Sequence, residues 1–493
     1  MGLADKDSPM AAPKPANDTF ASQRKVAVQS LGRLSVPFVD DHNRDWAKQG
    51  KAYNIRHPAV PAIIVFAENI QHIQDAVVSG VLAGLKVTAR CGGHSYASLG
   101  HGGEDNHLVV DITAMNDVSV DPVTHIATVG AGARLGHVAS ELYRQGGRAI
   151  AHGSCPGVGI SGHMLHGGYG WISHNKGLAL DWMIGASIVL ANGTEVHCSE
   201  TENADLFWAL RGAGSNFGIV TSYKLQTFPE PSESTPFKVI LDWDTEQENM
   251  DGLEALVEFS RTTPPELNMR LAAYESGDQA FEGVFYGSIA ELVGILAPLL
   301  KKTGGEVKAK TGNWLQGLEY YAERNSLIVP TPYKEHGNFY ATSLVLKDVP
   351  GPSLKEFVHY WHTRAIDFEL GGWFFQFDLY GGPTSAVSDV PNSASAYAHR
   401  DKAFLIQLYH YIDNEVAYPA SGISLFKNWI DVTIRSLEQS DWGMYINYVD
   451  TELDRQTAQK LYWGENLPRL RELKKRYDPA EVFYYPQSIT PAT

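Results

Sequence analysis

The first half of the chain carries short apolar patterns that alternate between the strand period and the helix period. Residues 60–82 begin as a strand and continue as a helix, whose predicted apolar face carries Ile70, Ile73, Val77, Val81 and Leu82. The pattern predicts further strands at residues 86–89, 108–112, 125–129 and 217–228. It predicts further helices at residues 135–145 and 204–211. Residues 183–198 form a predicted hairpin, because Asn192-Gly193 is a strong two-residue turn signal.

The pattern changes after a Pro/Ser/Glu stretch at residues 229–232, which is typical of a linker. Longer helices are predicted beyond it, at residues 246–261 and 290–302. Strands alternate with these helices, at residues 281–287, 339–346, 373–379 and 404–411. The second half is therefore expected to form a domain with an antiparallel sheet and flanking helices.

These patterns predict an α+β protein with two domains. Its expected parts are a disordered tail at residues 1–22, a first domain at 23–230, a second domain at 231–440 and a segment at 441–493 that returns to the first domain. With 493 residues, of which 44% are hydrophobic and 19% charged, the chain has ample apolar material for two cores.

Charge and apolar runs exclude several classes of partner. The formal net charge of −16 argues against nucleic acid and against an anionic membrane surface, because both require basic protein surface. No apolar run approaches the ~20 residues of a membrane-spanning helix, and the first 22 residues lack the apolar core of a signal peptide. Asn17 and Asn192 each begin a glycosylation sequon.

The chain has three cysteines, Cys91, Cys155 and Cys198. They are too few for a disulfide scaffold, and their spacing matches no zinc pattern. Since three is odd, at least one thiol is free or bonded to something other than cysteine.

Two glycine-rich loops carry the clearest candidate chemistry. The first, at residues 90–100, follows a predicted strand and places His94 among glycines, whose freedom to adopt positive φ lets backbone N–H groups form a concavity suited to phosphate. A surface turn with a hydrogen-bonded histidine is the alternative. The second loop, at residues 155–170, begins with Cys155 and is also rich in glycine.

Two further glycine motifs do not fit a nicotinamide dinucleotide site. Residues 130–136 lie between a strand and a helix, but their spacing is G-x-G-x-x-x-G and no acidic residue lies near ~20 positions later. Residues 212–218 lead into a strand. A metal site is also disfavoured, because no acidic ligand accompanies the nearby histidines, His152, His163, His166 and His174.

Polar residues gather on predicted strands of the second half. Gln376 and Asp378 share a strand face with Phe374, since strand side chains alternate. This face is either a polar ligand site or a half-exposed edge. Tyr445 and Tyr448 are either core residues or part of a binding wall.

Four stretches together resemble the berberine bridge enzyme-like group of vanillyl-alcohol oxidase-type flavoproteins, and within it the fungal oligosaccharide oxidases. They are Arg90-Cys91-Gly92-Gly93-His94-Ser95, Cys155-Pro156-Gly157-Val158-Gly159, Gly212-Ala213-Gly214-Ser215-Asn216-Phe217-Gly218, and the tail from Tyr477-Asp478-Pro479 to Gln487-Ser488-Ile489. The resemblance covers nearly the whole chain. It implies an FAD-binding domain followed by a cap domain with an antiparallel sheet.

The resemblance implies FAD bound covalently at two points. His94 matches the histidine joined to the flavin 8α carbon, and Cys155 matches the cysteine joined to C6. The other cofactor-binding positions that it implies are Arg90, Gly92, Gly93, Ser95, Gly157, Val158, Gly159, Gly162, Gly218, Tyr485 and Gln487.

The resemblance also implies a sugar site in the cap domain. Tyr448 matches the catalytic base that takes the proton of the anomeric hydroxyl, and Asp378 matches the carboxylate beside it. A free phenol has a pKa near ~10, so Asp378 is expected to accept the proton onward. The matching substrate positions are Tyr96, Tyr169, Glu275, Phe374, Gln376, Gln407 and Tyr445. Phe374 departs from the tryptophan often found at its position, which leaves the favoured sugar open.

The resemblance leads to one expected function and two alternatives. We expect a secreted, monomeric FAD-dependent oxidase that converts the C1 hydroxyl of gluco-, xylo- or chito-oligosaccharides to the lactone and reduces O₂ to H₂O₂, without a metal. One alternative is an oxidase or dehydrogenase of secondary metabolites, as in alkaloid-processing members of the group. The other is a flavin-bearing sugar-binding protein without turnover.

Overall fold

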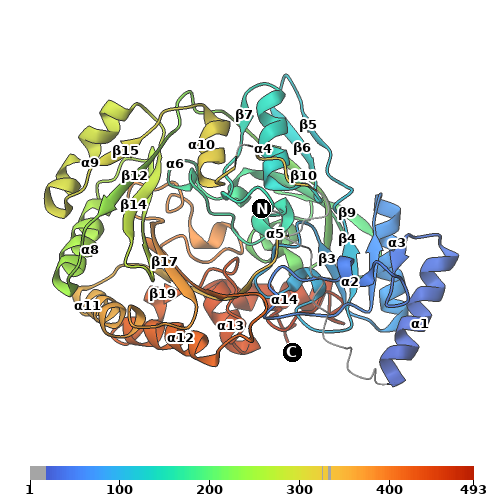
Figure 1. Ribbon diagram of the computed structural model, residues 1–493. Coiled ribbons are helices and arrows are strands. Elements are labelled where there is room, and N and C mark those ends of the chain that lie inside the picture. The colour runs from blue at the N-terminus through green and yellow to red at the C-terminus, as the bar shows by residue number, and fades with distance from the viewer. Residues whose placement is uncertain (1–17, 325, 331–334) are drawn as a thin grey trace.

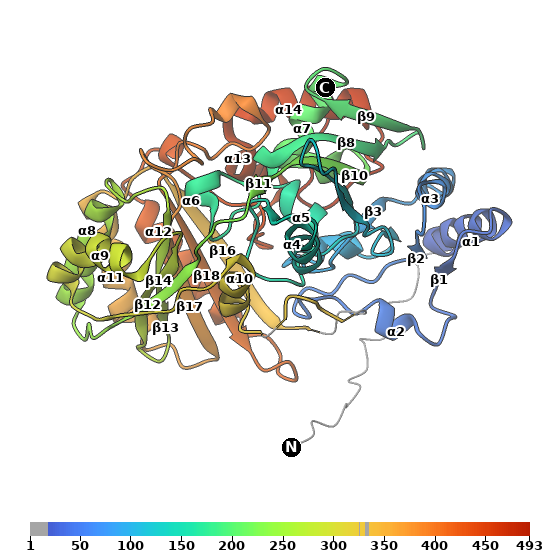
Figure 2. The same cartoon turned by 90° about the horizontal axis from the view of Figure 1, so that it is seen from above.

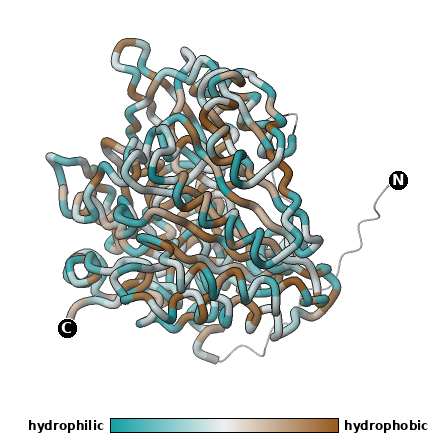
Figure 3. Tube along the Cα trace, turned by 90° about the vertical axis from the view of Figure 1, so that its left-hand side faces the viewer, coloured by the Kyte–Doolittle hydropathy of each residue, from teal (hydrophilic) through white to brown (hydrophobic). Residues whose placement is uncertain are grey.

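A computed structural model describes residues 18–324, 326–330 and 335–493 of the chain. It consists of two lobes that lie side by side (Figure 1). The first lobe comprises residues 18–230 and 444–493, and the cap lobe comprises residues 231–443. Apolar and polar segments interleave along the trace of both lobes (Figure 3).

The first lobe contains a small, mostly parallel sheet near its outer end. The strand order is β1 (Phe38–Val39), β2 (Ile63–Phe66), β4 (Leu108–Asp111) and β3 (Val87–Arg90). β2, β4 and β3 run parallel, and helix α3 (Ile70–Ala83) connects β2 to β3. α1 (Asp18–Arg33) packs on α3, and the short α2 (Trp46–Gln49) follows β1. β3 ends where the first glycine loop begins, so this sheet positions His94.

The second sheet of the first lobe is antiparallel and has the order β5 (Val118–Val120), β6 (Ile126–Gly130), β10 (Ile219–Gln226), β8 (Met183–Val189) and β9 (Glu195–Ser199). Two further strands, β7 (Arg148–Ala149) and β11 (Phe228–Pro229), pair with each other. The helices of this region are α4 (Leu135–Arg144), α5 (Ile160–Met164), α6 (Ser173–Lys176) and α7 (Ala204–Ala213). The second glycine loop runs from β7 through α5.

The cap lobe contains one eight-stranded sheet. Its order is β15 (Val307–Ala309), β12 (Thr235–Leu241), β14 (Gln279–Phe285), β13 (Leu267–Tyr274), β17 (Gly372–Leu379), β18 (Phe404–Ile412), β16 (Asn338–Leu346) and β19 (Trp442–Gly443). The helices on its outer face are α8 (Glu246–Ser260), α9 (Ile289–Thr303), α11 (Gly351–Tyr360) and α12 (Ala420–Ile434) (Figures 1 and 2). α10 (Trp314–Tyr321) lies near α4 of the first lobe.

Side-chain alternation decides which face of the cap sheet meets the helices. On β17, Phe375 packs against Phe357 and Trp361 of the helical layer, with ring centroids 5.2 and 4.8 Å away. Phe374 and Gln376 therefore point to the opposite face, because strand side chains alternate. That face is turned toward the first lobe.

The chain returns to the first lobe after β19 through α13 (Arg455–Trp463) and α14 (Leu467–Tyr477). Trp463 Nε1 donates a 3.1 Å hydrogen bond to the carbonyl oxygen of Gly212. The carbonyl oxygen of Val482 accepts a 2.9 Å hydrogen bond from the Val87 N–H of β3. The tail thus lies against the strand that leads into the first glycine loop.

Two expectations for the N-terminal part are wrong. Residues 18–22 of the predicted disordered tail belong to α1, and residues 1–17 lie outside the described residues. The apolar face predicted for α3 is wrong at three positions, because Ile70, Val81 and Leu82 are 38%, 45% and 62% exposed, whereas Ile73 and Val77 are buried as predicted. The buried face consists of Ile73, Ala76, Val77, Ser79, Gly80 and Ala83. Small residues fill this face, since a side chain at Gly80 would meet Val87 of β3 at 2.5 Å.

Candidate active site

A cavity of about 420 Å³ lies between the two glycine loops of the first lobe and the inner face of the cap sheet. Most of the site residues predicted from the sequence line it together. These are Gly92, Gly93, His94, Ser95, Tyr96, Cys155, Val158, Gly159, Gly162, Tyr169, Gly218, Gln376, Asp378, Tyr445, Tyr448 and Tyr485.

The two glycine loops touch each other through their backbones. A Cβ atom added to Gly92 would lie 2.2 Å from the backbone nitrogen of Gly159. A Cβ atom added to Gly159 would lie 2.3 Å from Cys91 Sγ. Only glycine permits this approach, which holds the two loops in a fixed relation and leaves backbone groups facing the cavity. Gly93, next to His94, has φ of +68°, which favours glycine over other residues.

His94 and Cys155 project into the cavity from different loops and meet there. Cys155 Sγ lies 3.4 Å from His94 Nε2. The ring of Tyr53 stacks on the His94 imidazole, with centroids 3.9 Å apart. Burial lowers the pKa of His94 to about 4, so the imidazole is neutral at neutral pH and keeps a nitrogen lone pair. A nucleophilic nitrogen and a sulfur are therefore adjacent on one wall.

The other two cysteines have a different environment. Cys91 and Cys198 are both buried and not disulfide-bonded. Burial raises the pKa of the Cys91 thiol to about 11 and that of Cys198 to about 12. Both remain protonated near neutral pH, which is typical of structural cysteines.

Asp378 is the buried carboxylate of the cap wall and is only 2% exposed. Its Oδ1 accepts a hydrogen bond of 3.3 Å from the Tyr169 hydroxyl. Among the described residues, its buried Oδ2 has no hydrogen-bond partner. Burial raises the pKa of Asp378 to about 6, and the positive charge of Arg270 limits the rise. The carboxylate is thus close to its titration point and has one oxygen available.

Arg270 is a cavity residue that sequence reasoning missed. It stands directly opposite Asp378 in the pairing of β13 with β17 and lines the cavity. Its guanidinium forms an ion pair with Glu282 at 2.6 Å and lies over the ring of Trp171, 4.4 Å from the ring centroid. A charged arginine in the mostly apolar run of β13 was the signal that could have revealed it, because unpaired charges are rarely placed in a buried strand.

Tyr448 and Tyr445, in the return segment after β19, also line the cavity but have different surroundings. The ring of Tyr448 stacks on that of Tyr96 at 6.0 Å and meets that of Tyr445 edge-on at 5.1 Å. Burial, followed by the negative charge of Asp378, raises the pKa of Tyr448 well above its usual value of 10. The Tyr445 hydroxyl accepts hydrogen bonds from the N–H groups of Gly168 and Tyr169, both at 3.0 Å. Tyr445 thereby ties the return segment to the second glycine loop, and both phenols are neutral near neutral pH.

Three predicted substrate residues lie beside the cavity rather than in its lining. Gln407 donates a 3.2 Å hydrogen bond to the Tyr96 hydroxyl. Phe374 stacks on Tyr409 with centroids 4.9 Å apart. Glu275 accepts a 3.3 Å hydrogen bond from Tyr411, which is 42% exposed. These three residues continue the inner face of the cap sheet from the cavity toward solvent.

Three predicted cofactor residues do not line the cavity. Arg90 is buried in an ion pair with Asp111 at 2.7 Å. The carbonyl oxygen of Gly157 accepts a hydrogen bond from Arg134. Gln487 donates to the carbonyl oxygen of Asp450 at 2.7 Å. These hydrogen bonds and the ion pair support the loops and the tail from behind the cavity.

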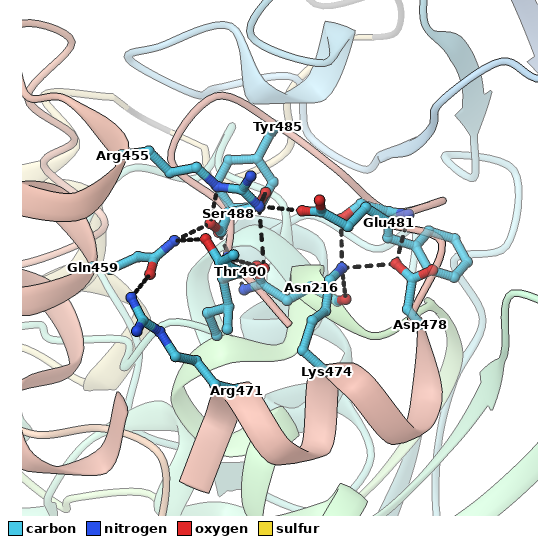
Figure 4. Close-up of polar contacts among 12 residues, drawn as sticks. Asn216, Arg455, Gln459, Arg471, Lys474, Asp478, Glu481, Tyr485, Ser488 and Thr490 are labelled. Atoms are coloured by element: carbon cyan, nitrogen blue, oxygen red, sulfur yellow. Dashed lines mark hydrogen bonds and ion pairs between the residues drawn. The ribbon is translucent and has the colours of Figure 1, made fainter. Parts of the chain in front are cut away.

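The return segment places Tyr485 on the cavity wall through a polar network (Figure 4). Lys474 is fully buried and pairs with Asp478 at 2.7 Å. Its ammonium group also donates to the carbonyl oxygens of Asn216 and Phe483, at 2.6 and 3.1 Å. Asn216 Nδ2 donates to the Tyr485 hydroxyl at 3.2 Å. This network holds the tail against the loop at residues 212–218, so residues far apart in the chain share one wall.

The histidines of the second loop make hydrogen bonds within the protein. His163 Nε2 accepts from the Gly153 N–H at 2.9 Å, and His166 Nε2 lies 2.8 Å from Ser215 Oγ. Within the described ranges, Asp40, Asp41 and His42 are the cluster in which three potential metal ligands approach one another, and this cluster lies near the surface. Across those same residues, no helix combines the length and apolarity needed to cross a membrane.

The residues of the cavity fit a large planar cofactor. Its first-lobe wall is lined by glycines, and a side chain at Gly92, Gly159 or Gly218 would collide with backbone or packed neighbours. Backbone groups in such a wall can approach a ring or a phosphate closely, while His94 and Cys155 offer two nucleophiles to it.

Comparisons with known proteins agree with this geometry. The family model described as FAD binding domain matches residues 61–199, and the model described as berberine and berberine like matches residues 444–490. The chain is 44% identical to a carbohydrate oxidase of Microdochium nivale over 468 residues, which are 94% of each chain. It is 39% identical to the FAD-linked oxidoreductase dpmaF of Metarhizium anisopliae, over 100% of this chain and 95% of that one.

Two solved structures are close in fold and sequence. The xylooligosaccharide oxidase from Myceliophthora thermophila, in complex with xylobiose, superposes with a TM-score of 0.92 at 42% identity, covering 95% of this chain and 100% of the other. The glucooligosaccharide oxidase from Acremonium strictum, which carries a 6-S-cysteinyl, 8α-N1-histidyl FAD, superposes with a TM-score of 0.91 at 39% identity. The match covers 95% of this chain and 100% of the other. FAD is therefore the cofactor of this protein, and the chain belongs to the berberine bridge enzyme-like family of FAD-dependent oxidoreductases of the vanillyl-alcohol oxidase type.

Proposed function

We propose that this protein is a carbohydrate oxidase that converts the anomeric C1 hydroxyl of an oligosaccharide to the lactone and reduces O₂ to H₂O₂. The observation that carries the proposal is the placement of Tyr448 and the buried carboxylate of Asp378 in the same cavity as His94 and Cys155. The similarity to enzymes named as carbohydrate and xylooligosaccharide oxidases supports the substrate class.

Tyr448 is proposed as the base and Asp378 as the group that takes the proton onward. The pKa of Tyr448 is raised by burial, so the phenol is neutral and can remove the C1 hydroxyl proton only while passing on its own. Asp378 has an unbonded Oδ2 among the described residues and a pKa of about 6, so at neutral pH it is an ionised acceptor. Bound FAD supplies the two-electron acceptor, and O₂ removes those electrons as H₂O₂.

His94 and Cys155 are proposed to be the attachment points of the flavin. Both nucleophilic atoms lie at one side of the cavity, 3.4 Å apart, and the His94 imidazole is neutral. The glucooligosaccharide oxidase of similar fold carries its FAD through one histidine and one cysteine. Small, half-buried Val158 lies in the cavity lining beside them, and we propose that it leaves room for O₂.

The inner face of the cap sheet is proposed to bind the sugar chain. The rings of Phe374 and Tyr409 on this sheet, and that of Tyr96 in the facing glycine loop, suit the C–H faces of pyranose rings. Gln376, Gln407 and Glu275 offer amide and carboxylate groups to sugar hydroxyls.

A second candidate keeps the flavin chemistry and changes the substrate to an aromatic secondary metabolite. The 39% identity to an enzyme named only as an FAD-linked oxidoreductase favours keeping this candidate. The buried aromatic rings that face the cavity would suit such a substrate as well.

The deciding experiment is H₂O₂ release from cello-, xylo- and chito-oligosaccharides, with phenolic and alkaloid substrates tested in parallel. Release with at least one sugar supports the proposal, whereas turnover only with the aromatic substrates supports the second candidate. Bleaching of the flavin by sugar under anaerobic conditions would exclude a sugar-binding protein without turnover.

We further propose secretion, a monomeric state and glycosylation of Asn192. The Asn192 side chain is exposed at the β8–β9 turn, where a glycan can be accommodated. Asn17, the other sequon, lies outside the described residues.

A further inference from the structure

The glycine motif at residues 130–136, which resembles a dinucleotide loop in its letters, uses its glycines for packing. A Cβ atom at Gly132 would lie 1.7 Å from the carbonyl oxygen of Ile112, and one at Gly136 would lie 1.9 Å from that of Leu327. The motif joins β6 to α4, directly behind the cofactor cavity. Its close contacts are therefore with protein backbone on both sides.

The backbone of this motif is bonded to the second glycine loop. Leu135 N–H donates to the carbonyl oxygen of Val158 at 2.9 Å, and Gly136 N–H donates to that of Pro156 at 3.1 Å. In the reverse direction, Ile160 N–H donates to the carbonyl oxygen of Ala133 at 2.9 Å. These bonds surround Arg134, whose side chain is half-buried.

The Arg134 side chain reaches both glycine loops. Its Nη1 donates to the carbonyl oxygen of Gly92 at 2.8 Å and also to that of Gly157. Gly92 is two residues before His94, and Gly157 is two residues after Cys155. One guanidinium nitrogen thus links the two loops that carry the two proposed attachment points.

We propose that Arg134 is a positioning residue that sets the relative placement of His94 and Cys155, so that both bonds to FAD form on the same cofactor. The proposal rests on the proposed covalent attachment. Arginine suits the role because its planar, permanently charged group directs hydrogen bonds in fixed directions, whereas a lysine ammonium is a flexible point charge. Gly92 and Gly157 cannot be positioned by side chains of their own.

Each attachment requires the nucleophile and the flavin carbon to meet at bonding distance. In each step the N–C or S–C bond forms. The nucleophile and the flavin carbon each lose one proton, and two electrons are released. O₂ takes up the two protons and the two electrons and becomes H₂O₂. Arg134 takes no part in the electron transfer. Its effect is on the fraction of cofactor that both nucleophiles can reach.

The test compares Arg134→Met and Arg134→Lys with the wild type, and uses Arg144→Met as the matched control. Arg144 is the last residue of α4, the helix that begins next to Arg134; it is exposed, and its ion pair among the described residues is with Glu141. Full-length proteins are produced with FAD, denatured and analysed by mass spectrometry of flavin peptides, which counts chains with two, one or no bonds. Circular dichroism and thermal melting report the folded fraction.

We expect two bonds in the wild type and in Arg144→Met, and at least a fivefold lower doubly bonded fraction in folded Arg134→Met, with singly bonded chains accumulating. Arg134→Lys should be intermediate and fully folded, and guanidinium ion added during FAD loading should raise the doubly bonded fraction of Arg134→Met more than ammonium does. Two bonds in both folded Arg134 variants at the wild-type level would overturn the inference. A wild type without covalent FAD would instead overturn the proposed attachment itself.

Discussion

The wall that the two glycine loops contribute to the cavity is made largely of backbone, whereas the wall of the cap lobe is made of side chains that alternate along strands. Gly92 and Gly159 touch so closely that neither tolerates a Cβ atom. On the cap side, Gln376 and Asp378 reach the cavity because every second residue of β17 points inward. The comparison suggests that the first wall holds an invariant cofactor and that the second determines substrate and proton transfer.

The two walls also differ in charge. On the first wall His94 is neutral, because burial lowers its pKa to about 4. The cap wall carries Asp378, Arg270 and Glu282 together, with Arg270 paired to Glu282. Charged groups in a buried site act strongly on one another, so the pH dependence of the reaction should arise from the cap wall.

The largest effect is expected from a single methyl group on the backbone wall. Gly92→Ala places Cβ 2.2 Å from the Gly159 nitrogen, where no side chain can move aside. Overpacking costs about 1–3 kcal/mol even in adaptable cores, so we expect less than about a tenth of the chains to retain FAD. Gly294→Ala, in helix α9 of the cap lobe, is the control, since a Cβ there also meets nothing within 4 Å. Equal FAD content in the two variants, measured by absorbance, would contradict the backbone account.

The next effect concerns the proposed base. Tyr448→Phe removes the phenol but keeps the ring that stacks on Tyr96, so FAD content should not change. The loss of a general base lowers kcat by about 10³-fold. Anaerobic flavin reduction in a stopped-flow instrument measures this step. Tyr411→Phe, at the exposed rim, is the control and should stay within about twofold. A similar rate in both variants would remove Tyr448 from the mechanism.

The third effect is a pH dependence set by Asp378. Its pKa is raised to about 6, so kcat/KM should fall as the pH drops through about 6 and the carboxylate is protonated. Because the folded protein holds this proton more tightly than the unfolded chain, Asp378 should make the protein less stable as the pH rises from about 4 to about 6. Asp378→Asn should lose that trend in thermal melts.

Arg270→Met tests the same assignment in the opposite direction. The positive charge of Arg270 lowers the pKa of Asp378, so its removal should move the acid limb of kcat/KM to higher pH. Lys224→Met, on β10 in the antiparallel sheet of the first lobe, is a charge-matched control with no expected shift. If the acid limb of kcat/KM stays at the same pH in Arg270→Met, Asp378 does not set the pH dependence.

The smallest effect is expected at Phe374. Its ring is half-buried and stacks on Tyr409 outside the cavity lining. Aromatic stacking contributes about 0.5–1.5 kcal/mol, so Phe374→Ala should raise KM for the preferred sugar by about 2- to 12-fold and leave kcat unchanged. Steady-state kinetics with sugars of increasing length measure the change. A large loss of kcat would move Phe374 from substrate binding to the chemical step.

The same comparison explains what sequence alone could predict. The backbone wall is visible in the sequence because glycines that cannot be replaced occur in recognisable runs, such as residues 90–100 and 155–170. The β8–β9 hairpin was predicted for a similar reason, since its turn requires Asn192-Gly193. In both cases a local backbone constraint selects the residue.

The cap wall and the supports of the cavity depend on contacts between distant residues. Arg270 meets Asp378 only because β13 pairs with β17, and Tyr485 reaches the cavity only through the network around Lys474. Arg90 and Gln487 match cofactor positions by motif, and the sequence does not reveal their tertiary partners, Asp111 and the carbonyl oxygen of Asp450. Periodicity on α3 identified Ile73 and Val77 correctly but missed the small residues Ala76, Gly80 and Ala83, which complete the buried face.

The most direct test of the central claim is anaerobic mixing of the wild-type protein with cello-, xylo- and chito-oligosaccharides while flavin absorbance is followed. We predict that at least one sugar bleaches the flavin, that Tyr448→Phe bleaches about 10³-fold more slowly, and that O₂ restores the colour with one H₂O₂ per flavin. A wild-type flavin that stays oxidised with every sugar, but is bleached by an aromatic alcohol, would contradict the account.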